Sequence, residues 1–151
     1  MTKREPTNTR KSRAPAIQLA LESATNADNW ISSESQFQEC AAKLLDSLGL
    51  LWCHVPNGGL RDKRTAAALK RQGVKPGVPD VMIFQPVTHF KVDVHTGCAI
   101  ELKYGKNRPT SAQKGWLVAL QLVDWYSDVA YSMEDVIAIL DECGYITGME
   151  E

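Results

Sequence analysis

The sequence predicts an α/β protein in which helices cover the faces of a mixed β-sheet. Three observations indicate this class. Apolar residues recur at helical spacing in several segments, short apolar runs of strand length lie between them, and capping residues or glycines mark the boundaries. The predicted order is α–β–α–β–β–α–β–α, which is typical of a mixed sheet with helices on its faces.

The bulk composition is that of one soluble globular domain. The chain has 151 residues, of which 44% are hydrophobic and 23% charged, and we expect a single domain over residues 14–151. No apolar run approaches the roughly eighteen residues of a membrane span. Residues 1–13 are polar and basic, so we expect them to form a disordered tail and not a secretion signal. We therefore expect a cytoplasmic location.

The cysteine pattern favours reduced thiols. No pair of cysteines has the C-x-x-C spacing, and each cysteine lies in an apolar context. We therefore predict that all four are core residues of a protein in a reducing compartment, with zinc or disulfide roles less favoured. These are Cys40, Cys53, Cys98 and Cys143.

The first well-supported helix begins after Ser33. Ser33 with Gln36 matches a capping box, apolar residues follow at helical spacing from Phe37 to Leu48, and Gly49 ends the run. A shorter helix over residues 14–24, with Ile17, Leu19 and Leu21 as its apolar residues, precedes it. Residues 50–55 then form the first predicted strand.

The middle of the chain predicts a basic helix and a pair of strands. Residues 62–72 form the helix, which ends at Gly73. Residues 80–85 and 98–103 form two apolar strands, and a hairpin-like region over residues 87–96 connects them.

The last three elements follow a basic loop. Thr110 or Ser111 caps a helix that runs to about Val123, and a short strand covers residues 128–131. Ser132 then caps a final helix that ends at Gly144. The predicted buried side of the first of these helices consists of Trp116, Leu117, Leu120 and Val123.

The net charge of −1 hides a strong sorting of charge along the chain. Residues 61–75 contain six Lys or Arg residues against one acid, and residues 124–151 contain eight acids and no Lys or Arg. One face can therefore be cationic, which suits a polyanionic partner such as nucleic acid. Two solvated faces of opposite sign are the plainer alternative.

The strongest functional signal combines three ionisable residues on two predicted strands. Asp80 begins one strand, whereas Glu101 and Lys103 end the other and point to the same face, two residues apart. If the strands pair, Asp80 joins them. Two carboxylates and an ammonium group at one sheet edge can hold a divalent cation and activate a water molecule.

The first helix adds polar residues that can face this edge. Glu34 lies in its first turn and supplies a possible third carboxylate, and Gln38 lies one turn later on the same face. Each piece alone has a plainer interpretation. A Glu-x-Lys triplet is often a surface ion pair, and Pro-Asp is often a turn. The combination, with basic loops flanking both strands, is more specific.

Several of these motifs together resemble a known nuclease family. Pro79-Asp80 followed by Glu101-Leu102-Lys103 resembles the PD-(D/E)xK signature, and in particular the VRR-NUC (virus-type replication-repair nuclease) branch. The matching pieces occur in the expected order over residues 33–143. They are Ser33-Glu34 with Gln38, Val55-Pro56-Asn57-Gly58-Gly59, Gly73-Val74, Gly77-Val78-Pro79-Asp80, Ile100-Glu101-Leu102-Lys103, Ser111 with Gln113 and Trp116, and Ser132.

The resemblance implies a restriction-endonuclease-like core and Mg²⁺- or Mn²⁺-dependent cleavage of DNA. It implies that Asp80 and Glu101 bind the metal, that the main-chain carbonyl of Leu102 completes the metal shell, and that Lys103 positions or activates the water. Glu34 matches the acid of the first helix. Gln113 matches the glutamine after the core motif, as a positioning residue or a phosphate contact.

Basic residues on both sides of the strands are candidate DNA contacts. The loop at Asn57-Gly58 is either a simple turn or a site where main-chain N–H groups approach a phosphate. Sequence-independent contacts to the DNA backbone would follow from two groups of side chains. The first is Arg61, Lys63 and Arg64, and the second is Lys106 and Arg108.

The sequence therefore predicts a metal-dependent DNA endonuclease. Because no second DNA-binding domain is visible, we expect a homodimer that acts on branched or Holliday-type DNA in replication and repair or in phage DNA processing. Two other classes stay open. The chain can be a DNA-binding module without catalysis, or a nuclease subunit whose acidic C-terminal part docks a partner protein.

Overall fold

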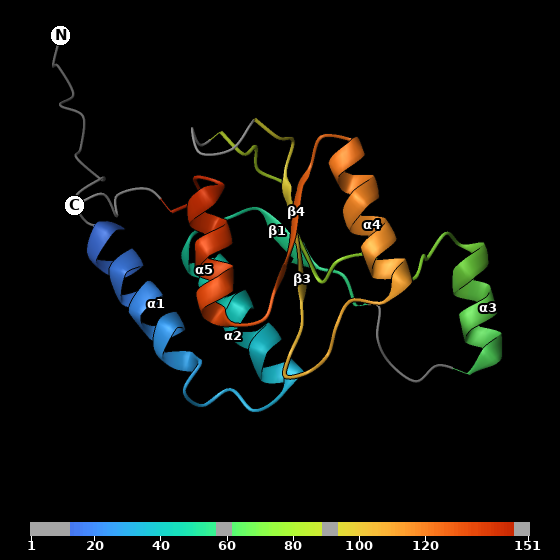
Figure 1. Ribbon diagram of the computed structural model, residues 1–151, viewed down its shortest axis with the longest axis horizontal. Coiled ribbons are helices and arrows are strands. Elements are labelled where there is room, and N and C mark those ends of the chain that lie inside the picture. The colour runs from blue at the N-terminus through green and yellow to red at the C-terminus, as the bar shows by residue number, and fades with distance from the viewer. Residues whose placement is uncertain (1–12, 57–61, 89–93, 147–151) are drawn as a thin grey trace, which may run out of the picture.

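The computed structural model describes residues 13–56, 62–88 and 94–146 and contains five helices and four strands within those ranges (Figure 1). The short helix predicted over residues 14–24 is present as α1, and the elements after it follow the predicted order. In chain order the elements are α1 Arg13–Ala27, α2 Glu34–Ser47, β1 Trp52–His54, α3 Lys63–Arg71, β2 Val81–Ile83, β3 Cys98–Leu102, α4 Ser111–Leu122, β4 Tyr126–Ala130 and α5 Met133–Glu142.

The four strands form one mixed sheet in the order β1-β2-β3-β4. β1 pairs with β2 and β2 pairs with β3 in antiparallel fashion, with Val81 opposite Ile100. β3 and β4 are parallel, with Leu102 opposite Ala130, and α4 connects them as the crossover helix. The predicted class, a mixed sheet flanked by helices, is therefore confirmed.

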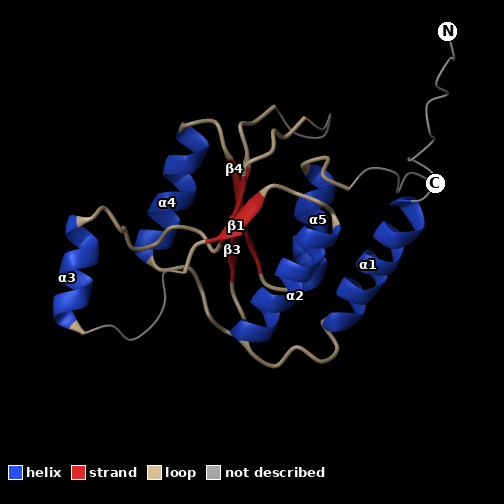
Figure 2. Cartoon of the chain, turned by 180° about the vertical axis from the view of Figure 1, so that it is seen from behind, coloured by secondary structure: helices blue, strands red, loops and turns tan. Residues whose placement is uncertain are grey.

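Helices cover both faces of the sheet. α1, α2 and α5 lie on one side, and α4 lies on the other (Figures 1 and 2). α3 lies beyond α4 at the end of the molecule in both views, and none of its residues is buried. An amphipathic helix of this kind contributes little to the core and leaves its basic side chains free for another task.

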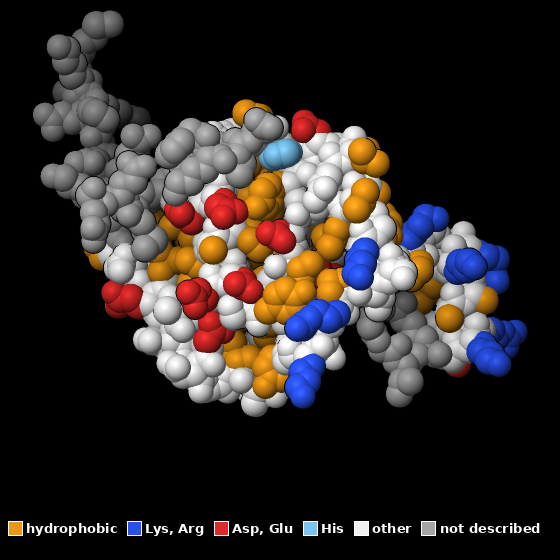
Figure 3. Space-filling view, in the orientation of Figure 1, with side chains coloured by type: hydrophobic (Ala, Val, Ile, Leu, Met, Phe, Trp, Pro, Cys, Tyr) orange, Lys and Arg blue, Asp and Glu red, His pale blue; other side chains and the backbone are white. Residues whose placement is uncertain are grey.

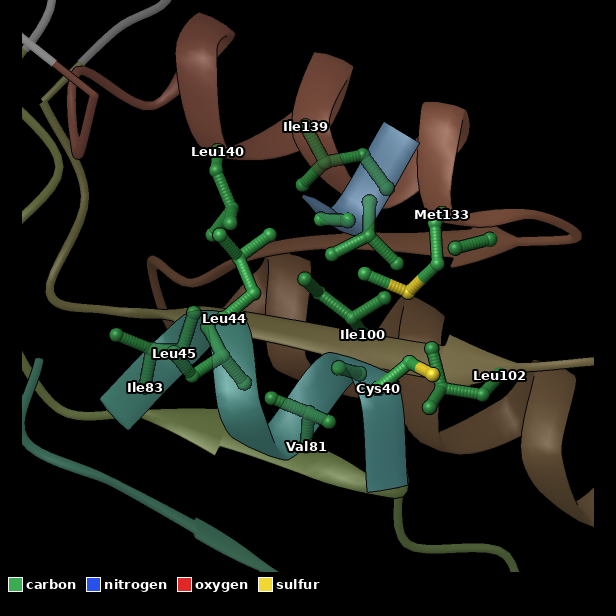
Figure 4. Packing of buried hydrophobic residues seen from close by; sticks show 14 of the residues in the cluster. Cys40, Leu44, Leu45, Val81, Ile83, Ile100, Leu102, Met133, Ile139 and Leu140 are labelled. Atoms are coloured by element: carbon green, nitrogen blue, oxygen red, sulfur yellow. The ribbon is translucent and has the colours of Figure 1, made fainter. Parts of the chain in front are cut away.

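The hydrophobic core lies between the sheet and the layer formed by α2 and α5 (Figure 4). Ile100 and Leu102 of β3 point into this core together with Val81 and Ile83 of β2. Because side chains alternate along a strand, the two neighbours of Leu102 point to the opposite face of the sheet, which α4 covers. These neighbours are Glu101 and Lys103.

Local capping sets the helix boundaries close to the predicted ones. Thr110 and Gln113 form a complete capping box at α4, and Ser132 caps α5. At α2, Ser33 accepts a hydrogen bond from the main-chain N–H of Gln36, but the Gln36 side chain accepts one from Ser32 N–H. The predicted reciprocal box at Ser33 is therefore only half formed, since the glutamine bonds one residue further back.

A second cap comes from a residue distant in the sequence. The carboxylate of Asp28, just after α1, accepts hydrogen bonds from the main-chain N–H groups of Met133 and Glu134. This pairing satisfies free N–H groups at the start of α5 and places a negative charge at the positive end of the helix dipole. It thereby ties α1 to α5.

Several sequence expectations about burial were wrong. α1 extends to Ala27, and it buries Leu21 with Ala24 and Ala27, whereas Leu19 is 67% exposed. Val123 is 64% exposed because it lies past the end of α4. Cys53 is exposed on the edge strand β1, while the other three cysteines are buried. Of the predicted N-terminal tail, only Arg13 lies within the described residues, and it begins α1.

The hairpin predicted over residues 87–96 is described only at its base. Val87 and His95 form an isolated antiparallel bridge, and residues 89–93 lie outside the described residues. Among the helices of the described ranges, none has the length and apolar character needed to cross a membrane.

Gly77 offers a test of how tightly the segment before β2 packs on α4. Its φ is +89°, and an added Cβ would lie 2.5 Å from the main-chain carbon of Ala112. Gly73 has a similar φ of +97° but open space around it. We expect Gly77→Ala to lower the free energy of unfolding by more than about 2 kcal/mol, because strain at positive φ and a main-chain clash add.

Gly73→Ala is the matched control, since it carries only the conformational cost of about 1–2 kcal/mol. Chemical denaturation of both variants measures the difference. Equal losses of stability would show that the contact between Gly77 and α4 is not tight.

Candidate active site

Asp80 and Glu101 are brought together by the register of β2 and β3. Val81 pairs with Ile100, so extending the antiparallel ladder by one residue places Asp80 directly opposite Glu101. Residues opposite each other in such a pair have Cβ atoms about 4.5–5.5 Å apart. The predicted convergence of these two carboxylates at one sheet edge is therefore what the topology produces.

Two hydrogen bonds hold the carboxylate and the main chain of Asp80. Its Oδ2 accepts a hydrogen bond of 2.8 Å from the N–H of Leu102. Its main-chain carbonyl accepts one of 2.9 Å from the N–H of Val55. Asp80 is thus linked to both neighbouring strands, which limits its freedom to turn away from Glu101.

Glu101 and Lys103 form an ion pair on the face of β3 that α4 covers. The Nζ of Lys103 lies 2.9 Å from Oε1 of Glu101, and the two residues are 7% and 1% exposed. The other carboxylate oxygen, Oε2, is enclosed and has no hydrogen-bond partner among the described residues. The main-chain N–H of Asp80 lies close to this carboxylate and stabilises its charged form.

The electrostatics of the pair favour protonation of Glu101. Burial raises the pKa of Glu101 to about 7, the nearby Asp80 carboxylate adds to the rise, and Lys103 opposes it. Burial also raises the pKa of Asp80, against the hydrogen bond from Leu102 and the charge of Lys103. Two acids with perturbed pKa values beside a cation are typical of a functional site.

A pocket of about 290 Å³ opens beside Asp80 and Leu102. Residues of α2 line it on one side, including Glu34 and Gln38 as predicted, and His54 and Pro56 line it on another. The N–H and C=O of a strand residue point to the same side, so the carbonyl of Leu102 also faces the edge where Asp80 lies. The Nε2 atom of Gln38 is buried without a hydrogen-bond partner.

The donor set fits a hard divalent cation held by two acids rather than three. Asp80, Glu101 and the Leu102 carbonyl offer oxygen atoms, the ligand type that Mg²⁺ and Mn²⁺ take. Within the described ranges, however, no three Asp, Glu, His or Cys side chains gather closely enough to form a metal group. Glu34 is exposed, so the predicted convergence of three acids is corrected to a pair, with Glu34 across the pocket.

Gln113 takes part in helix capping. Its Oε1 accepts a hydrogen bond of 2.8 Å from the N–H of Thr110, and Thr110 caps the same turn of α4. The side-chain oxygen of Gln113 is therefore part of the N-terminal cap of α4. Only its side-chain amide nitrogen is left for the predicted contact with a phosphate.

The predicted DNA-binding residues that the structure describes lie in two places. Lys63 and Arg64 are exposed in the first turn of α3, and Lys106 and Arg108 are exposed in the loop after β3. The guanidinium carbon of Arg108 lies 5.1 Å from the ring centre of Tyr131. Asn57, Gly58 and Arg61 lie outside the described residues.

Charge is separated on the face of the molecule that Figure 3 shows, as the sequence predicts. In Figure 3, Lys and Arg side chains gather on the side of the molecule where α3 lies, and Asp and Glu side chains gather on the other side. Sorting of this kind gives one end of the molecule a positive potential that attracts a polyanion.

Sequence reasoning missed two ionisable residues that line the pocket, His54 and Glu39. His54 directly precedes the Val55-Pro56-Asn57 motif, and its period-two position on a strand places it on one face with Trp52. This period-two spacing could have identified His54 from the sequence. No comparable pattern marks Glu39, which follows Gln38 on α2 and belongs to no motif.

Comparisons with known proteins give a distant likeness to a solved structure. No family model matches the chain, and no curated protein matches it. One solved structure that it resembles is described as "VRR_NUC domain protein", with 22% sequence identity, coverage of 83% of this chain and 84% of that chain, and a TM-score of 0.48.

The raised pKa of Glu101 predicts a dependence of stability on pH. The carboxyl ionises near 4.5 when unfolded and near 7 when folded, so the folded state binds more protons between these values. Stability in the absence of metal then falls as pH rises from about 4.5 to about 7, because folding buries a charge. We expect Glu101→Gln to remove most of this fall.

Denaturant unfolding in EDTA at pH 5 and pH 7.5 measures the effect in both proteins. Groups remote from Glu101 cancel in the comparison, whereas Asp80, whose pKa is also raised, accounts for the dependence that remains in Glu101→Gln. The same pH dependence in both would show that Glu101 has an ordinary pKa.

Proposed function

We propose that the protein is a metal-dependent DNA endonuclease. The observation that carries the proposal is the group formed by partly buried Asp80 with buried Glu101 and Lys103, in which Oε2 of Glu101 has no hydrogen-bond partner among the described residues and Asp80 lines an open pocket. Exposed basic side chains on α3 and after β3 supply a surface for a polyanion. Acids alone would repel DNA, so a bound cation is needed to reconcile these two features.

A purely structural ion pair explains the site less well. Taking charges out of water costs several kcal/mol per ion, and a buried pair offsets this only when its remaining oxygens are hydrogen-bonded. Here two acids face one lysine, and Oε2 of Glu101 is unpaired. Such an arrangement opposes folding, and a cation between the acids would relieve it.

In the proposed mechanism, Asp80, Glu101 and the Leu102 carbonyl would hold Mg²⁺ or Mn²⁺. The ion, when bound, supplies Lewis-acid polarisation of the phosphate and lowers the pKa of water. Lys103 orients the attacking water and stabilises negative charge that develops on the phosphate. Glu34 orders a water molecule or a second ion from across the pocket, and no covalent enzyme intermediate is needed.

Two alternatives stay testable. A binding module without catalysis has no need for acids at a surface that meets phosphate, and this speaks against it. A nuclease subunit that needs a partner protein would use the acidic surface over β4 and α5, where Asp128, Asp135 and Glu142 line a hollow of about 170 Å³. Such a protein would be inert alone and active with the partner.

The preferred substrate in this proposal is branched DNA, cut by a homodimer. The described residues contain one small α/β unit with little surface for a long duplex, so two copies are needed to address both strands of a junction. The α4 helix leaves Val118 and Leu122 exposed at 56% and 82%, which offers an apolar surface to a second copy. Light scattering at micromolar concentration is expected to give the mass of a dimer.

Removal of the central groups is expected to abolish cleavage while the fold stays intact. Asp80→Asn and Lys103→Met should each lower the rate by about 100-fold or more, because each removes charge that acts on the reacting phosphate. Glu34→Gln should have a smaller effect, since Glu34 is exposed and outside the pair. The assay uses labelled single-stranded, duplex, flap and four-way junction DNA with Mg²⁺, Mn²⁺ or EDTA.

Glu22→Gln is the control, because Glu22 is an exposed carboxylate on α1 and does not line the pocket beside Asp80. Wild-type rates in both Asp80→Asn and Lys103→Met would contradict the mechanism. Binding of DNA by the wild type without cleavage under any metal condition would favour the binding module.

The basic side chains of α3 are expected to contribute to affinity through phosphate contacts. Lys63→Ala and Arg64→Ala should each weaken DNA binding regardless of sequence and reduce the salt dependence of log K by about one unit. Lys43→Ala on α2, which lies beside the α1–α2 surface, is the matched control and should leave the slope unchanged. Fluorescence anisotropy in EDTA over a range of salt concentrations measures all three, and equal slopes would exclude α3 from the interface.

A further inference from the structure

His54 ends the edge strand β1 and lies against the main chain of Asp80. Its Nδ1 is 2.8 Å from the carbonyl oxygen of Asp80, and its ring lines the same pocket as Asp80, Glu34 and Leu102. β1 is only three residues long and pairs on one side. The histidine is therefore the last side chain of this strand before the chain leaves the sheet.

The contact determines which ring nitrogen of His54 carries a proton. A carbonyl oxygen can only accept a hydrogen bond, so Nδ1 of His54 must carry a proton and donate it to Asp80. The Asp80 carbonyl then accepts two hydrogen bonds, one from His54 and one from the N–H of Val55 at 2.9 Å. Both of its lone pairs are used.

The bond from His54 is not needed to satisfy this carbonyl. The sheet ladder already provides the hydrogen bond from Val55, and His54 itself is exposed, so the extra bond adds little to folding. It does restrict the peptide that follows Asp80. The carboxylate of the same residue is held from the other side by the N–H of Leu102 at 2.8 Å.

We propose that His54 is a positioning residue for the cation site, and that it acts through Nδ1 by fixing the main chain of Asp80. His54 and Leu102 hold Asp80 at its carbonyl and its carboxylate, so that the carboxylate stays opposite Glu101. Groups that orient a metal ligand in this way typically affect metal affinity by 10- to 100-fold. The inference rests on the proposed function, because it assigns His54 to the site where the cation binds.

Two isosteric substitutions separate the ring nitrogens. The amide nitrogen of asparagine occupies nearly the place of Nδ1, and that of glutamine nearly the place of Nε2. His54→Asn can therefore keep the hydrogen bond to Asp80, whereas His54→Gln and His54→Ala lose it. Cys53→Ser is the control on the same strand, because Cys53 is exposed and does not line the pocket.

The measurement is Mn²⁺ binding to the whole protein without DNA, by titration calorimetry and by the loss of the free Mn²⁺ signal in electron paramagnetic resonance. We expect His54→Gln and His54→Ala to raise the Kd for Mn²⁺ about 10-fold, with His54→Asn and Cys53→Ser within about twofold of the wild type. Thermal unfolding of the same samples in EDTA is expected to give similar Tm values, since a purely structural role would lower Tm and leave the Kd unchanged.

The other outcomes overturn the inference in distinguishable ways. A wild-type Kd in all three His54 variants removes the positioning role and leaves the proposed nuclease function intact. An equal loss of affinity in all three variants, or a loss in His54→Asn alone, excludes the action through Nδ1. Absence of Mn²⁺ binding by the wild type removes both the inference and the proposed metal site.

Discussion

The burial of a charged group on β3 is the constraint on which the site depends. All five residues of this strand are buried, because α2 and α5 cover one face and α4 covers the other (Figures 1 and 4). Glu101 therefore lies in a low-dielectric environment with Lys103 as its partner at 2.9 Å. Low dielectric strengthens this attraction and at the same time makes the unpaired Oε2 and the nearby Asp80 costly. A cation would relieve both costs.

The sheet topology converts this local constraint into a site. Asp80 precedes a strand and Glu101 ends one, and the antiparallel ladder places them opposite each other. The hydrogen bond from Leu102 N–H to Asp80 continues the ladder beyond β2 with a side chain in place of a carbonyl. The carboxylate of Asp80 is thereby positioned by the main chain of the strand that carries Glu101. Errors in register would move the two acids apart, so fold and site are coupled.

The basic residues differ from the acidic ones in their location, because they lie at the surface. α3 buries no residue, and its Lys and Arg side chains extend the positive side of the molecule beyond α4 (Figures 1 and 3). Arg108 is held over the ring of Tyr131, which follows β4 at the same end of the sheet as Leu102. Cations at the surface and acids in the interior therefore approach one edge from two directions. Gly77, packed against Ala112 of α4, holds the intervening segment close to the helix.

The sequence by itself determined the element order, most of the helix boundaries and the shared face of Glu101 and Lys103, whereas the meeting of these two residues with Asp80 depended on the pairing of β2 with β3. The first three follow from local chemistry: caps and glycines mark helix ends, and period-two spacing places Glu101 and Lys103 on one face. Only the tertiary structure decided that Glu34 stays apart from the acidic pair, that His54 binds the Asp80 carbonyl, and that Cys53 and Val123 are exposed. Those outcomes depend on how layers pack and where strands end, and spacing along one segment carries no information about contacts between segments.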